Sequence, residues 1–184
     1  MVNYKRMNKP RGKAAANFAN RGKPLEMMIE ASNNMYIHKG WADVQKAEPP
    51  VKVQNKVGNK ITLGWYQKHG FVDYFGVSNG RAIAFEAKTT NIRTSFPLGN
   101  IEPHQVEVLK RWHDHGAAAF LLIDFQKHDE VYLLWYKQLE EWWESAKNGG
   151  RKSIPYTWFH LNCDLVKSQR GVPLDYLYSL KLPG

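Results

Sequence analysis

The chain has 184 residues, of which 43% are hydrophobic and 13% aromatic, and this composition excludes a globally disordered protein. The single cysteine excludes an internal disulfide framework, and no apolar run is long enough to span a membrane, so we expect a soluble, cytoplasmic protein. Lys and Arg number 26 against 17 acids, and the net charge of +9 favours a polyanionic partner. Composition alone does not separate DNA from RNA or a membrane surface.

The N-terminal segment is strongly basic. Residues 1–20 are predicted to form a flexible arm, and the first 23 residues carry seven Lys or Arg and no acid. Such an arm can follow a phosphate backbone, and Arg21 at its end is a candidate DNA contact. The alternative is a solubilising tail. Residues 21–184 are then expected to form a single domain.

Two elements and a projecting segment are predicted next in the chain. Helical spacing of apolar residues predicts a helix that begins at Pro24 and ends near Gly40. A strand over residues 41–46 follows and is ended by two prolines. Residues 51–66 alternate loosely between apolar side chains and lysines, with Gly58-Asn59 near the middle, which predicts a hairpin. This hairpin has too few apolar residues for a core element and should project.

The remaining pattern alternates strands and helices. Residues 72–77 and 81–88 are predicted to be two strands joined by a short turn at Ser78-Asn79-Gly80. They are followed by a helix between Pro103 and Gly116, a nearly continuous apolar strand over residues 117–125, a strand over 130–135 and a final helix over 139–146. This order predicts a mixed α/β fold.

Several tryptophans fall in the predicted helices. Trp112, Trp142 and Trp143 recur with other apolar residues at helical spacing, so packing in the core is favoured over stacking on nucleic acid. Trp158, further on, is interpreted as a core or dimer contact.

The strand over residues 81–88 carries a charged pair that could perform phosphodiester hydrolysis. Strand alternation puts Glu86 and Lys88 on one side, beside small alanines that leave room for a metal and a phosphate. Asp73 lies on the adjoining strand, and hairpin pairing can bring its carboxylate beside Glu86. Two such carboxylates repel unless a hard cation lies between them, and Mg²⁺ prefers oxygen ligands. The alternative is an exposed polar pair on an edge strand, since the short motif is weak by itself.

Asp73 followed by Glu86-Ala87-Lys88 resembles the PD-(D/E)xK nuclease signature, with Val72 in place of the leading proline. More of the chain resembles one branch of that superfamily, the RecU-type Holliday junction resolvases, in order from about residue 20 to residue 178. The stretches that carry the resemblance are Asn20-Arg21-Gly22, Leu25-Glu26, Asp73-Tyr74, Gly76-Val77, Gly80-Arg81, Phe85-Glu86-Ala87-Lys88, Phe96-Pro97-Leu98, His104-Gln105 and Pro173-Leu174-Asp175-Tyr176-Leu177.

The resemblance implies a fold and an activity. The fold would be a restriction-endonuclease-like α/β core, a central mixed sheet flanked by helices, with a projecting basic β-hairpin stalk at about residues 51–66. The activity would be that of a homodimeric endonuclease that requires Mg²⁺, for which Mn²⁺ substitutes. It would resolve four-way DNA junctions by paired symmetric nicks that leave 5′-phosphate ends, in homologous recombination and DNA repair, with recombination proteins as further partners and no membrane association.

The resemblance also implies roles for individual residues. Asp73 and Glu86 would ligate the metal, and Lys88 would stabilise the transition state. Gln105 and Glu26 would be further metal ligands. The candidate DNA contacts, through the phosphate backbone or through base stacking, are Arg21, Lys52, Lys56, Lys60, Trp65, Tyr66 and Arg81.

One position departs from the family pattern. Phe71 stands two residues before the aspartate, where family members often carry a small hydroxyl residue near the metal. If that position contributes only its backbone carbonyl, metal binding changes little. If the hydroxyl takes part in metal binding, the affinity of this chain for metal is altered.

Two other functions remain open, namely a linear-duplex endonuclease of the same superfamily and a non-catalytic junction-binding accessory protein. The acid-free projection argues against the first, because linear DNA has no open centre to probe. The intact set of Asp73, Glu86 and Lys88 argues against the second, because binding alone favours fewer carboxylates near phosphate.

Overall fold

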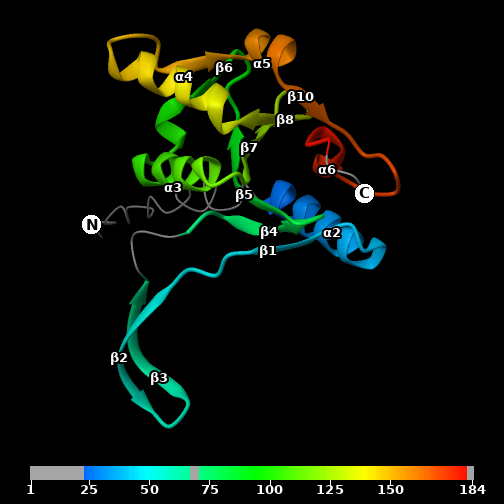
Figure 1. Cartoon of the computed structure of the whole chain (residues 1–184). Coiled ribbons are helices and arrows are strands. Elements are labelled where there is room, and N and C mark those ends of the chain that lie inside the picture. The colour runs from blue at the N-terminus through cyan, green and yellow to red at the C-terminus, as the bar shows by residue number, and fades with distance from the viewer. Residues whose placement is uncertain (1–22, 67–70, 182–184) are drawn as a thin grey trace, which may run out of the picture.

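A six-stranded mixed sheet forms the centre of the protein, with helices packed against both faces (Figure 1). The computed structural model describes residues 23–66 and 71–181, so the predicted basic arm and Arg21 lie outside the described residues. In spatial order the strands are β1 (Asp43–Lys46), β4 (Tyr74–Ser78), β5 (Arg81–Thr90), β7 (Ala118–Phe125), β8 (Glu130–Trp135) and β10 (Asp164–Val166). Neighbouring strands are antiparallel except β5 and β7, which run parallel. The predicted mixed α/β class with a flanked central sheet is confirmed.

Two apolar cores lie on the two faces of the sheet. One face is covered by α2 (Lys23–Lys39) and by the C-terminal helix α6 (Tyr176–Ser179), and the other by α3 (Pro103–Asp114), α4 (Tyr136–Lys147) and α5 (Tyr156–Asn162). Strand alternation directs Phe85 and Phe120 into the first core, and Ala84 and Leu121 into the second. All eight residues of β7 are buried, as its continuous apolar sequence predicts.

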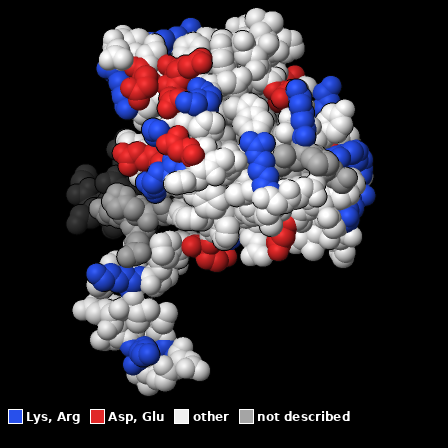
Figure 2. Space-filling model, in the orientation of Figure 1, with Lys and Arg blue, Asp and Glu red and all other residues white. Residues whose placement is uncertain are grey.

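A long hairpin projects from the sheet between β1 and β4 (Figure 1). It consists of β2 (Val51–Val57) and β3 (Lys60–Tyr66), and every residue of both strands is exposed. Gly58 in the turn has a φ of +57°, a conformation that favours glycine. Figure 2 shows lysine side chains but no acid on the visible face of the hairpin, which contains no arginine. The predicted projecting basic hairpin is therefore confirmed.

Several strand boundaries and the C-terminal part differ from the prediction. The strand predicted over residues 41–46 begins at Asp43, and the strand predicted from Val72 begins at Tyr74, so that Asp73 lies just before β4. The predicted final helix, α4, is followed by β9 (Ser153–Pro155), α5, β10 and α6. β9 pairs with β6 (Ser95–Pro97), which leads into the short helix η1 (Leu98–Asn100). The missed strands have three residues each, too few to show an alternating pattern, and α5 and α6 have only seven and four residues, fewer than a helical period needs to be recognised.

The tryptophans of the helices pack as the sequence predicts. Trp112, Trp142, Trp143 and Trp158 are partly buried against the core that α3, α4 and α5 cover. Trp142 and Trp158 meet edge to face, with ring centroids 5.6 Å apart. None of the helices in the described ranges is long and apolar enough to cross a membrane.

A buried polar network fixes the segment after β10 to α2. Asp175 is fully buried and accepts hydrogen bonds from Arg170, at 2.6 Å from Nε and at 2.9 Å from Nη2. The Tyr36 hydroxyl of α2 donates to the same carboxylate at 3.1 Å, and the Tyr176 hydroxyl donates to Asn33 of α2 at 2.5 Å. These bonds join distant parts of the chain and hold α2 in place over the sheet.

Replacing Asp175 with Ala is expected to lower the free energy of unfolding by about 3 kcal/mol, because Arg170 and Tyr36 lose a buried acceptor. Urea denaturation followed by circular dichroism measures this change. The matched control is Asp114→Ala, which removes an exposed ion pair with Lys110 and should leave the urea midpoint nearly unchanged. Equal midpoints for the two variants would contradict the role given to Asp175.

Candidate active site

An aspartate, a glutamate and a lysine meet where β4 begins and β5 approaches its end. The backbone N–H of Ala87 donates to Asp73 Oδ2 at 3.1 Å, which fixes Asp73 to β5 although it lies outside β4. Lys88 Nζ lies 3.1 Å from Glu86 Oε2 and 3.8 Å from Asp73 Oδ2. The structure therefore brings the three residues of the predicted chemical centre together, with one amine facing both carboxylates.

The Glu86 carboxyl is the most deeply buried group of the site. Its side chain has no solvent exposure, whereas those of Asp73 and Lys88 are 39% and 17% exposed. Burial, together with repulsion from Asp73, raises the pKa of the Glu86 carboxyl to about 8, and Lys88 opposes this rise. Glu86 Oε1 is buried without a hydrogen-bond partner among the described residues.

This arrangement fits a divalent cation. A buried carboxylate oxygen without a partner costs free energy, and a bound cation would satisfy it. The same cation would relieve the repulsion between Asp73 and Glu86, and their oxygens are the ligands that Mg²⁺ prefers. Both the donor set and the unpartnered oxygen thus point to one ion between the two carboxylates.

Helix α3 contributes Gln105 to the site from its first turn. The Gln105 Nε2 donates to Glu86 Oε2, while its Oε1 accepts from the backbone N–H of Glu102 at 3.0 Å in a capping box. The structure therefore places Gln105 against Glu86 through its nitrogen. Its implied role as an oxygen ligand of the metal requires the amide to rotate.

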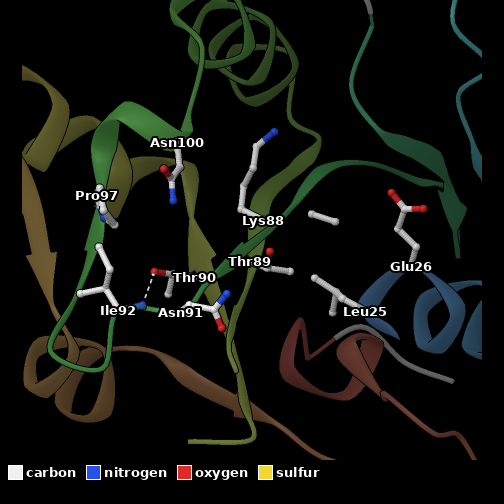
Figure 3. A pocket seen from close by; sticks show the side chains of 10 residues that line it. Leu25, Glu26, Lys88, Thr89, Thr90, Asn91, Ile92, Pro97 and Asn100 are labelled. Carbon is white, nitrogen blue, oxygen red and sulfur yellow. Dashed lines mark hydrogen bonds between the residues drawn. The ribbon is translucent and has the colours of Figure 1, made fainter. Parts of the chain in front are cut away.

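Glu26 lies on α2 and lines a cavity of about 440 Å³ that Lys88 also lines (Figure 3). Its Oε2 is 2.9 Å from Lys46 Nζ of β1, and the same amine is 3.6 Å from Glu30 Oε1. Within residues 23–66 and 71–181, no group of three or more His, Cys, Asp or Glu side chains is arranged to hold a metal. Glu26 is thus near the cavity but is not grouped with Asp73 and Glu86.

The cavity also has polar lining residues that the sequence analysis did not single out. Thr89, Thr90 and Asn91 continue from Lys88, and Asn100 joins them from η1 (Figure 3). The threonines directly follow the motif, so strand alternation could have placed them. Asn100 and Lys46 carry no such signal, because only the tertiary fold brings their segments to the site.

The predicted DNA contacts lie on two parts of the protein. The hairpin carries Lys52, Lys56, Lys60, Trp65 and Tyr66, all exposed. Lys52 Nζ lies 5.9 Å from the centroid of the Trp65 ring, so one lysine is held over an aromatic face. Arg81 lies at the start of β5, where its Nε donates to the Gly116 carbonyl oxygen at 3.4 Å. Arg21 falls outside the described residues.

Comparison with known proteins gives consistent matches. The family described as RecU, Recombination protein U, matches residues 20–182. The Holliday junction resolvase RecU of Oceanobacillus iheyensis is 37% identical over 165 residues, covering 87% of this chain and 84% of that relative. The protein of the same name from Geobacillus kaustophilus is 34% identical over 178 residues, covering 93% and 86%. That from Staphylococcus aureus strain COL is 38% identical over 176 residues, covering 90% and 85%.

Solved structures also match, and we describe one of them. It is that of Hjc, a Holliday junction resolvase from the archaeal hyperthermophile Archaeoglobus fulgidus, determined at 1.6 Å resolution. The match covers 72% of this chain and 92% of Hjc, with 12% identity and a TM-score of 0.41. At that identity and score the likeness carries no argument about this chain.

Without divalent cation, stability is expected to fall between about pH 5 and pH 8. The pKa of Glu86 is about 8 in the folded protein, whereas the pKa of a glutamate in the unfolded chain is about 4.3. In this window the folded state binds more protons than the unfolded state, so the free energy of unfolding decreases as the pH rises. Glu86→Gln has no carboxyl group to titrate at this position. Its free energy of unfolding, relative to that of the unaltered protein, should therefore increase from pH 5 to pH 8.

Urea denaturation of both proteins in EDTA at each pH measures this difference. Asp124, whose pKa burial raises to about 6, is present in both proteins and cancels from the comparison. Added Mg²⁺ should stabilise the unaltered protein more at pH 8 than at pH 5, because it binds the ionised carboxylate. A difference that stays constant over the pH range would show that the burial of Glu86 does not raise its pKa.

Proposed function

This chain belongs to the recombination protein U family, and we propose that it is a Mg²⁺-dependent endonuclease that nicks four-way DNA junctions in homologous recombination. Its curated relatives carry the name Holliday junction resolvase. The observation that carries the proposal is the contact of Asp73 and Glu86 with one amine, that of Lys88, beside a buried carboxylate oxygen without a partner.

Asp73 and Glu86 would hold the metal ion, and two neighbours keep their carboxylates in position. The Ala87 N–H restrains Asp73, and the Gln105 amide restrains Glu86. A Mg²⁺ ion bound there would polarise the phosphate and lower the pKa of a water molecule. One restraint is a backbone N–H of β5, and the other is a side chain that the capping box of α3 holds in place. The carboxylates are therefore arranged before the DNA binds.

Lys88 would act on the phosphate itself. Its ammonium group offsets part of the charge of the two carboxylates, which would otherwise repel a DNA phosphate. During hydrolysis, negative charge grows on the phosphate oxygens, and a nearby ammonium stabilises that charge. We expect the bond between phosphorus and the 3′ oxygen to break, which leaves a 5′-phosphate end.

The hairpin supports a branched rather than a linear substrate. It projects from the body, carries lysines and two aromatic residues, and has no acid in residues 51–66. A four-way junction has an open centre that such a projection can enter, and its unstacked bases could meet Trp65 and Tyr66. Symmetric resolution needs two nicks, and each chain offers one such centre, so we propose that two copies act together as a homodimer.

A cleavage assay tests the activity. The unaltered protein should nick a four-way junction that cannot branch-migrate when Mg²⁺ is present and not when EDTA replaces it. Asp73→Asn and Glu86→Gln should each lower nicking at least about 1,000-fold, because a metal ligand is lost, yet still bind the junction in a gel-shift assay.

The matched control is Asp164→Asn, which removes an exposed carboxylate of β10 and should leave nicking unchanged. Linear duplex of the same sequence serves as the competing substrate. Full cleavage by both site variants would remove the assignment of the site. Faster cleavage of the duplex than of the junction would favour a linear-duplex endonuclease.

Replacing Lys52, Lys56 and Lys60 together by Ala should weaken junction binding and reduce its salt dependence. Each lost phosphate contact is expected to reduce the slope of log K against log salt by about 0.9, so three contacts reduce it by about 2.7. The control replaces Lys127, Lys152 and Lys167 by Ala. These lysines are exposed on the body, and their replacement removes the same charge. An equal change of slope in both triple variants would mean that net charge, and not the hairpin, controls binding.

A further inference from the structure

We propose that an open cavity between α3 and the starts of β5 and β7 holds an unstacked nucleobase of the DNA substrate. The cavity has a volume of about 460 Å³ and is lined by Phe71, Ala82, Arg111, Trp112, His115 and Ala117. It is separate from the cavity beside Lys88, with which it shares no lining residue. This inference rests on the proposed function in that the ligand is DNA.

Aromatic rings form one wall of the cavity. The Phe71 ring meets Trp112 edge to face at 5.4 Å and Phe75 edge to face at 5.3 Å, so two contacts set its orientation. Nevertheless 50% of Phe71 is exposed to solvent. An aromatic ring that is held in place and half exposed offers a face on which a base can stack.

The size and character of the floor suit a flat aromatic ligand. Ala82 lies near the start of β5, and Ala117 lies directly before the parallel neighbouring strand β7; their small side chains leave space below the aromatic wall. No acidic residue lines the cavity. A planar, neutral nucleobase can therefore enter the cavity, and no acidic side chain there repels the phosphate attached to it.

Basic side chains surround the cavity. Arg111 and His115 line it, and Arg81 reaches the adjoining Gly116 carbonyl oxygen at 3.4 Å. In the described part of the chain neither arginine forms an ion pair with a carboxylate. Guanidinium groups that are not neutralised by acids suit the phosphates that flank a bound base. This complementarity favours a nucleotide over an apolar peptide.

The cavity also lies at a distance from the active site that one DNA strand can bridge. Trp112 follows Gln105 by seven residues on the same face of α3, which corresponds to about 10 Å along the helix axis. Ala82 precedes Glu86 by four residues on β5, or about 13 Å along the strand. Both separations equal three to four base steps of about 3.4 Å. The cavity would therefore receive a base near the phosphate that is cut.

Phe71 thereby gains a role at the position that departs from the family pattern. A small hydroxyl side chain there could not form the aromatic wall that Phe71 makes with Trp112. The base-binding cavity is therefore expected to be a property of chains that carry an aromatic residue at this position. It would influence where near the branch this protein cuts.

A fluorescence experiment tests the proposal. Asp73→Asn protein, in which cleavage is blocked, is titrated into four-way junctions that carry a single 2-aminopurine at successive positions within about four nucleotides of the branch. Binding should change the fluorescence at one or two positions, because stacking on Phe71 replaces stacking on a neighbouring base. Adding Phe71→Ala should abolish this change and weaken junction binding roughly five- to ten-fold.

Two further variants separate stacking from folding. Phe71→Tyr keeps the ring and should keep the fluorescence change. Leu161→Ala truncates an apolar side chain that is 80% exposed on α5, and it should alter neither the fluorescence signal nor the affinity.

Arg111→Ala should weaken binding and reduce its salt dependence, with Arg151→Ala as the matched control. Circular dichroism confirms that each variant is folded.

The outcomes distinguish the two proposals. The base-binding proposal is overturned if the fluorescence changes persist in Phe71→Ala. It is also overturned if no position shows a change, as would follow if the cavity takes a peptide. The titration does not require cleavage. A protein with intact Asp73 that fails to nick the junction with Mg²⁺, but whose 2-aminopurine response depends on Phe71, therefore overturns the nuclease proposal and supports the base-binding cavity.

Discussion

The burial of a second carboxylate beside Asp73 is the constraint on which the chemistry of this protein depends. Glu86 has no access to water, and its Oε1 has no partner among the described residues. Burial therefore raises its pKa to about 8, and Lys88 offsets only part of that cost. In an open chain the two carboxylates would move apart or be solvated. Because the fold holds them together, their combined negative charge would attract a cation, for which both would be ligands in the function that we propose.

The fold can maintain this unfavourable arrangement because β5 lies in the interior of the sheet. It pairs with β4 on one side and with β7 on the other, and apolar cores cover both of its faces. Gly76 lets β1 approach β4 closely, since a Cβ atom there would collide with the Asp43 carbonyl oxygen. The free energy gained by burying the two cores thus opposes the cost of burying Glu86.

A backbone hydrogen bond joins the base of the hairpin to the active site. The hairpin carries lysines, whereas the active site contains two carboxylates. The backbone N–H of Ala47, after β1, donates to the Asp73 carbonyl oxygen at 2.8 Å, where the chain returns from the hairpin to β4. Asp73, which we propose as a metal ligand, thus lies at the base of the segment that carries the lysines and exposed aromatic rings. A DNA branch held by the hairpin would therefore lie at a defined distance from Asp73 and Glu86. In the function that we propose, the hairpin would attract the polyanion, and a separate surface would hydrolyse one of its bonds.

The local geometry of this protein follows from patterns in its sequence. Period-two alternation placed Glu86 and Lys88 on one side of a strand, Gly58 marked the hairpin turn, and the continuous apolar run from residue 117 predicted a strand buried on both faces. These features depend on side-chain direction along a few neighbouring residues, which the backbone period specifies. By contrast, the depth at which Glu86 is buried, its contact with the nitrogen of Gln105, and the pairing of Lys46 with Glu26 could not be predicted from the sequence and are set by the way the chain packs. Those contacts join segments far apart in the chain, and their free energy depends on packing and solvent exclusion, which no local pattern of residues encodes.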